Sequence, residues 1–113
     1  MNNLLSGKQG EAQAEEYLKD KGYEVIERNY RYKRAEIDLI VKQGNTLVFV
    51  EVKARSKNRY GYPEEAVNDK KRQNLLAAAD QYIYEKNWLH NIRFDIIAIL
   101  NKTELRHFED AFG

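Results

Sequence analysis

Residues 36–42 are Glu-Ile-Asp-Leu-Ile-Val-Lys, residues 46–55 are Thr-Leu-Val-Phe-Val-Glu-Val-Lys-Ala-Arg, and Gly44-Asn45 lies between them. Both stretches are rich in β-branched residues and predict strands, and Gly44-Asn45 suits a two-residue hairpin turn. Counting outward from Gln43 opposite Thr46 gives the cross-strand pairs Ile40–Phe49, Asp38–Glu51 and Glu36–Lys53. We therefore expect an antiparallel hairpin that sets two carboxylates against each other.

The two faces of this hairpin are expected to differ, because side chains alternate along a strand. The charged face is predicted to carry Glu36, Asp38, Glu51 and Lys53. The opposite face is predicted to be an apolar wall of Ile37, Leu39, Val41, Val48, Val50 and Val52. Apolar residues also continue the charged face at Ile40, Leu47 and Phe49, so the charged cluster should lie at the edge of a covered surface.

Two opposed carboxylates about 5 Å apart repel each other, so something should compensate their charge. A divalent cation does so well, because Mg²⁺ is held by one or two carboxylates together with water and phosphate oxygens. Glu11, at the margin of a predicted helix's apolar stripe, could supply a third carboxylate. Such an ion would stabilise phosphate charge and activate a bound water, which Lys53 could orient or deprotonate. The alternative is an exposed face with a Glu36–Lys53 ion pair and a solvated Asp38.

The rest of the chain predicts further elements around this hairpin. A helix is expected from a capping Ser6 to a terminating Gly22, followed by a strand over 23–32. Four further segments are predicted: an exposed loop over 56–63, a helix over 64–86, a strand over 93–100 and a short element over 105–112. The order α-β-β-β-α-β with a C-terminal tail indicates one α/β domain over 1–113, with a mixed sheet flanked by helices.

Composition excludes several classes of protein. The 113 residues are 42% hydrophobic and 33% charged with a single proline, which excludes a disordered chain. The longest apolar run, residues 96–100, is far too short to span a membrane, and residues 1–8 predict no secretory signal. The absence of cysteine excludes disulfides, thiolate zinc sites and cysteine nucleophiles, and suits a cytoplasmic location.

Positive charge is concentrated in the middle of the chain. The whole protein has a net charge of +1, but residues 28–72 carry 12 basic and 6 acidic side chains. Such a block can bind a polyanion, or it can be an ordinary solvated surface. Arg55, Lys57 and Arg59, beside the proposed metal, are candidate phosphate contacts. Lys71 could contact a phosphate too, or be an ordinary exposed helix lysine.

Other residues have structural interpretations. Tyr30 is expected to pack half-buried, and Trp88 and Phe94 to lie in the core. His90 and His107 lack metal-ligand spacing and are expected to be structural or exposed.

Motifs over nearly the whole chain resemble the YraN-type family of small bacterial proteins. They are Gly10-Glu11-x-x-Ala14, Gly22-Tyr23, Arg28-Asn29-Tyr30-Arg31, Glu36-Ile37-Asp38-Leu39-Ile40, Phe49-Val50-Glu51-Val52-Lys53-x-Arg55, Ala66-Val67 with Lys71, Arg93-Phe94-Asp95 and Ala111-Phe112. That family is similar to the restriction-endonuclease-like, PD-(D/E)xK superfamily, near the archaeal Holliday-junction resolvases. Two positions depart from the pattern: Ala35 replaces a usual glycine, and Ile37 replaces the proline of the superfamily motif.

The resemblance implies a restriction-endonuclease-like fold and a catalytic core of Glu11, Asp38, Glu51 and Lys53. It implies a nuclease that uses Mg²⁺ or Mn²⁺, held by the three carboxylates, and hydrolyses phosphodiester bonds in DNA. Branched or flapped DNA is among the candidate substrates, and the resolvase-like relatives imply a homodimer. Two alternatives stay open: a non-catalytic nucleic-acid-binding module on the same fold, and an adaptor that contacts another protein.

Overall fold

A computed structural model describes residues 3–55 and 69–112. Its elements are α1 (Asn3–Asp20), β1 (Glu24–Tyr32), β2 (Ala35–Gln43), β3 (Thr46–Arg55), α2 (Asp69–Lys86), β4 (Asn91–Leu100) and β5 (Glu104–Phe108). The predicted α/β class and element order are confirmed, and the C-terminal tail adds a fifth strand. The expected loop over 56–63, the first residues of the predicted second helix, Lys57 and Arg59 lie outside the described residues.

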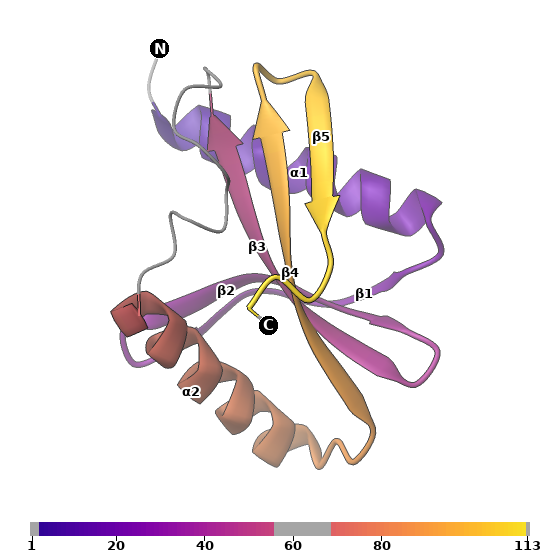
Figure 1. The fold of residues 1–113 in the computed structure, drawn as a ribbon, viewed down its shortest axis with the longest axis vertical. Helices are drawn as coiled ribbons and strands as arrows, with labels where there is room; N and C mark the ends of the chain where they lie inside the picture. The colour runs from indigo at the N-terminus through magenta and orange to yellow at the C-terminus, as the bar shows by residue number, and fades with distance from the viewer. Residues whose placement is uncertain (1–2, 56–68, 113) are drawn as a thin grey trace.

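The five strands form one mixed sheet in the order β1-β2-β3-β4-β5. β3 and β4 are parallel and joined through α2, while the other neighbouring strands are antiparallel. The sheet is strongly twisted, so that the β1–β2 pair crosses the direction of β3, β4 and β5 (Figure 1). The predicted hairpin register is confirmed from Gln43–Thr46 at the turn to Leu39–Val50.

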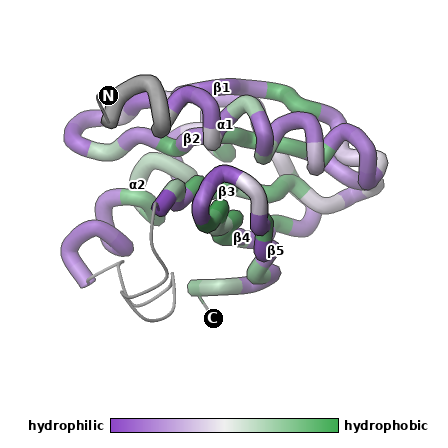
Figure 2. The backbone as a smooth tube through the Cα atoms, turned by 90° about the horizontal axis from the view of Figure 1, so that it is seen from above, coloured by the Kyte–Doolittle hydropathy of each residue, from purple (hydrophilic) through white to green (hydrophobic). Residues whose placement is uncertain are grey.

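The helices lie on opposite faces of the sheet, and each covers its own apolar core (Figure 2). The core under α1 contains Ala14, Leu18, Tyr23, Leu39, Val41, Val48, Val50, Ile97 and Ile99. The core under α2 contains Ala35, Ile37, Ile40, Leu47, Phe49, Leu75, Ala78, Ala79 and Tyr82. Burial of β3 and β4 between two helices explains why both strands are almost continuously apolar.

One predicted side-chain position is wrong. Ile37 packs with Ile40 under α2, rather than with Leu39 and Val41 under α1. The alternation along β2 is therefore interrupted between Ile37 and Leu39, where Asp38 lies. The physical reason is that the paired part of β2 and β3 ends at Leu39–Val50, which frees the start of β2 to turn relative to β3.

The helix boundaries differ little from the prediction. α1 begins at Asn3 rather than at Ser6. The helix ends where expected, because Gly22 has a φ of +93° and the Tyr23 N–H donates to the Leu18 carbonyl at 2.9 Å. Neither described helix is long and apolar enough to cross a membrane.

Candidate active site

The site begins at the point where β2 and β3 separate. Asp38 is one residue beyond the last backbone pair of the two strands, Leu39–Val50. There its side chain, in place of a backbone carbonyl, accepts a hydrogen bond from β3. Its Oδ2 accepts a hydrogen bond from the Val52 N–H at 2.7 Å. The carboxylate of Asp38 is thereby fixed in the seam between the two strands, beside Glu51.

Glu51 and Lys53 follow Phe49 on the side of the sheet that α2 covers, and both are 8% exposed. The Glu51 Oε2 lies 3.3 Å from the Lys53 Nζ and 2.8 Å from the Lys71 Nζ on α2. Glu36 forms its ion pair with Arg31, at 3.4 Å. The alternative Glu36–Lys53 pair is thus not formed, and Lys53 belongs to the Glu51 cluster.

Glu11 reaches the same region from the other face of the sheet. Gly10 allows this approach, because a Cβ there would come within 3.0 Å of the Ala54 Cβ on β3. Glu11 Oε1 accepts a hydrogen bond from the Asn29 side-chain amide at 3.3 Å. Asn29 has a φ of +52° and lies between Arg28 and Tyr30 on β1. These two residues pair with the β2 residues on either side of Asp38. Asn29 therefore holds Glu11 toward Asp38.

The electrostatics of the cluster follow from this crowding. Burial, and next the charge of Glu51, raise the pKa of Asp38 to about 7, with smaller contributions from Glu11 and Glu36. The Val52 N–H opposes this rise because it stabilises the carboxylate. Burial and the neighbouring Lys71 lower the pKa of Lys53. Burial, the largest single effect, acts against the Lys71 ammonium. The hydrogen bonds to Glu51 and Lys53 and the charges of Glu51 and Asp38 together outweigh it and raise the pKa of Lys71.

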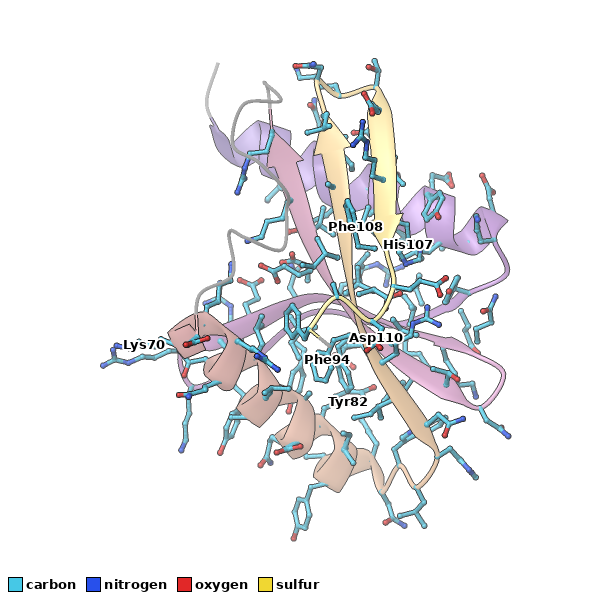
Figure 3. All side chains as sticks on the ribbon, viewed as in Figure 1. Lys70, Tyr82, Phe94, His107, Phe108 and Asp110 are labelled. Carbon is cyan, nitrogen blue, oxygen red and sulfur yellow. The ribbon has the colours of Figure 1, made fainter. Side chains whose placement is uncertain are left out.

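One oxygen of Glu51 lacks a donor. Oε1 is buried and has no hydrogen-bond partner in the described part of the chain. Glu51 also borders a cavity of about 10 Å³, whose other walls include Phe94 and, from the C-terminal tail, Phe112. These two rings stack at 5.3 Å, and Phe94 lies between α2 and the sheet (Figure 3). A desolvated carboxylate oxygen without a donor is unfavourable and marks a position where a cation or donor would be stabilising.

The donor set partly fits the expected metal. In residues 3–55 and 69–112, no group of three or more histidine or acidic side chains is arranged to hold an ion. Asp38 and Glu51 remain as a pair, and oxygen donors from one or two carboxylates are what Mg²⁺ and Mn²⁺ commonly take. The pair fits such an ion, with the Glu51 Oε1 as a ready ligand. Glu11 as a third ligand stays a prediction.

Two of the residues predicted to contact phosphate, Arg55 and Lys71, lie in the described part of the chain and have different surroundings. Arg55 is half-buried at the end of β3, where its guanidinium donates to the Ala54 carbonyl at 3.3 Å. Lys71, predicted as a phosphate contact or an exposed lysine, is the ion-pair partner of Glu51. The sequence alone offered no signal for this pairing, because the two residues are far apart in the chain.

A second buried network was missed by sequence reasoning. Asp95 on β4 is 0% exposed and accepts hydrogen bonds from the Arg93 guanidinium, while the His107 Nε2 lies 2.7 Å from its Oδ2. Tyr23 and Tyr17 extend the network through Arg93 and His107. Burial alone would raise the pKa of Asp95, but the hydrogen bonds from His107 and Arg93 lower it. His107 is structural, as predicted.

The prediction for Tyr30 is confirmed, whereas Trp88 and Phe94 lie at the margin of the core rather than inside it. Tyr30 is partly buried, packs edge-on against Tyr82 at 5.1 Å between ring centroids, and donates a hydrogen bond to Glu85. Trp88 and Phe94 pack against the core under α2. His90 is exposed.

The fold and this cluster define a small α/β protein with a charged site at the junction of two sheet strands. The profile of the Uncharacterised protein family UPF0102 matches residues 10–99. A UPF0102 protein of Christiangramia forsetii is 49% identical over 109 residues, covering 94% of this chain and 92% of that one. A UPF0102 protein of Natranaerobius thermophilus is 47% identical over 119 residues, covering 99% and 100%. The chain belongs to the UPF0102 family, the YraN-type group that its motifs indicated.

Proposed function

We propose that this protein is a metal-dependent nuclease that hydrolyses phosphodiester bonds in DNA in the cytoplasm. The observation that carries the proposal is the convergence of Asp38, Glu51 and Lys53 at the strand junction. Two carboxylates are held together there with a buried lysine, and one carboxylate oxygen is left without a donor. Clusters of buried, mutually perturbed charges are more common at functional sites than elsewhere, although structural networks also contain them.

Each residue of the cluster has a role in this proposal. Asp38 and Glu51 would hold the ion, which when bound would stabilise charge on the phosphate and acidify a water. Lys53 is placed to orient the attacking water or to donate to a phosphate oxygen. Its lowered pKa makes the neutral amine more accessible for taking a proton from that water. The water oxygen would form the new bond to phosphorus while the bond between phosphorus and the leaving ester oxygen breaks, and a solvent water would give that oxygen its proton.

A second candidate is a nucleic-acid-binding module that does not cleave. It is favoured by the ion pair between Lys71 and Glu51, at 2.8 Å, which occupies an oxygen that an ion would otherwise use. In this alternative the Lys71 ammonium neutralises the Glu51 carboxylate permanently. The basic residues between positions 28 and 72 would still bind phosphates. For either candidate function we also propose that the protein is a homodimer, and the resemblance to resolvases supports this.

The test is cleavage of duplex, flap and four-way DNA by the purified protein in Mg²⁺ or Mn²⁺, with EDTA as the blank. Asp38→Asn and Lys53→Met should each reduce the cleavage rate by about 10²-fold or more, the usual effect of removing an acid–base group. Asp80→Asn, which changes an exposed carboxylate on α2, is the matched control and should cleave like the parent.

The outcomes separate the candidates. Binding of DNA without cleavage in any metal would favour the non-catalytic module. Cleavage that survives Asp38→Asn undiminished would show that another protein or another site is responsible, and the nuclease proposal would be wrong. Absence of both binding and cleavage would remove nucleic acid as the substrate.

A further inference from the structure

An open cleft lies next to the candidate active site, between the β1–β2 turn and the first turns of α2. It has a volume of about 310 Å³ and is bordered by Arg34 and Glu36 on one side and by Lys70, Lys71 and Asn74 on the other. Figure 3 labels Lys70 at the end of α2 that lies beside this turn. The cleft leads to the cluster, because Lys71 borders the cleft and also contacts Glu51.

The cleft carries an excess of positive charge. Among the described side chains on its walls, three are cationic and one, Glu36, is a carboxylate, which is already paired with Arg31 at 3.4 Å. Arg34 and Lys70 are exposed, and within the described ranges neither forms an ion pair with a carboxylate. Two cations therefore face each other across the cleft, and no described side chain places an anion between them.

We infer that this cleft binds the phosphodiester backbone of a nucleic-acid strand, with Arg34 and Lys70 contacting phosphate from opposite walls. The inference rests on the proposed function and adds the path by which the strand reaches the site. Arg34 offers a planar fork of donors and Lys70 a compact charge, and both side chains are typical phosphate contacts.

Size and position favour a backbone segment over other anions. A volume of 310 Å³ is at the lower end of pockets that enclose small molecules, which suits one sugar-phosphate unit of a longer strand. Lys71 on the wall of the cleft contacts Glu51, so we expect a strand bound in the cleft to pass close to the carboxylate pair. An acidic protein segment would meet the same positive charges, so competition with polyglutamate is the measurement that separates the two.

The test compares two double variants in EDTA, where cleavage cannot occur. Arg34→Gln with Lys70→Gln removes the two exposed cations of the cleft and leaves Lys71 in place. Arg106→Gln with Lys86→Gln is the charge-matched control, since Arg106 is on β5 and Lys86 lies about 24 Å from Lys70 along α2 at 1.5 Å per residue. The readout is fluorescence anisotropy of a labelled single-stranded oligodeoxynucleotide over a series of salt concentrations. Thermal unfolding confirms that all variants are folded.

The cleft variant should weaken binding, and the slope of log affinity against log salt should become shallower by about 1.4. Each neutralised phosphate on a single strand contributes about 0.7 to that slope. The control should keep the parent slope. Equal slopes for parent and cleft variant would overturn the cleft assignment but leave the nuclease proposal standing. Competition by polyglutamate as effective as by DNA would also overturn it. If the parent binds no DNA, the proposed function and this inference both fail.

Discussion

Replacing Asp38 by asparagine should stabilise the protein at neutral and alkaline pH while it removes the proposed activity. The folded protein holds the Asp38 carboxylate in a buried seam beside Glu51, which raises its pKa from 3.8 to about 7. Ionising this group therefore opposes folding. Asparagine has nearly the same shape, does not ionise, and keeps a carbonyl oxygen to accept the Val52 N–H.

The pH range follows from the direction of the shift. Between about pH 4 and pH 7 the folded state binds more protons at Asp38 than the unfolded state, so the parent's free energy of unfolding decreases as pH rises. A shift of about three pKa units corresponds to roughly 4 kcal/mol. The asparagine NH₂ group lowers this gain by about 1–2 kcal/mol if it is left without an acceptor. We expect a net stabilisation of about 2–4 kcal/mol above pH 8. Near pH 4 we expect no gain, and a loss of about 1–2 kcal/mol if the NH₂ group has no acceptor.

Urea unfolding of parent and Asp38→Asn in EDTA, at several values from about pH 5 to about pH 8, measures this difference directly. Titrating groups that do not interact with Asp38 are shared and cancel, so the difference between the two proteins reports on Asp38 together with the neighbouring charges coupled to it. Asp80→Asn should show no such pH-dependent gain, because Asp80 is exposed on α2. A constant or shrinking difference between Asp38→Asn and the parent as pH rises would refute the reasoning, since it would mean that ionised Asp38 is not destabilising.

Three further predictions test other parts of the structure, each by urea or thermal unfolding. Phe112→Ala should lower the free energy of unfolding by about 2 kcal/mol, because it removes the ring stacked on Phe94; an unchanged stability would show that the tail does not pack there. Gly10→Val should cost about 1–3 kcal/mol through overpacking against Ala54, and Ala54→Gly should restore part of this loss. Asp95→Asn should cost about 2–4 kcal/mol at neutral pH, because it breaks a buried ion pair. Because the pKa of Asp95 is lowered in the folded state, its carboxylate stabilises the parent at pH values above the usual aspartate pKa, and acidification removes this stabilisation. The free energy of unfolding of Asp95→Asn should therefore fall less than that of the parent as pH drops below 4.

Local patterns predicted most of the fold. The hairpin register depended on the Gly44-Asn45 turn and the alternation of polar and apolar residues, and both are properties of neighbouring residues. The same count selected Asp38, Glu51 and Lys53, which do converge. The predicted alternation of side chains was wrong at Ile37, which packs under α2 and not under α1. The prediction assumed that β2 and β3 stay paired beyond Leu39, and they do not. No local signal shows where a twisted sheet lets two strands separate.

The amino-acid sequence by itself determined the elements, their order and which carboxylates share a hairpin, because these depend on contacts between residues that are close along the chain. Only the tertiary structure decided how those carboxylates are neutralised. Lys71 reaches Glu51 because α2 packs across the sheet, and Asn29 holds Glu11 because β1 and α1 meet there. The charge state of Asp38 depends on burial and on the field of groups brought from three different elements. Such long-range electrostatics exist only once the chain has folded.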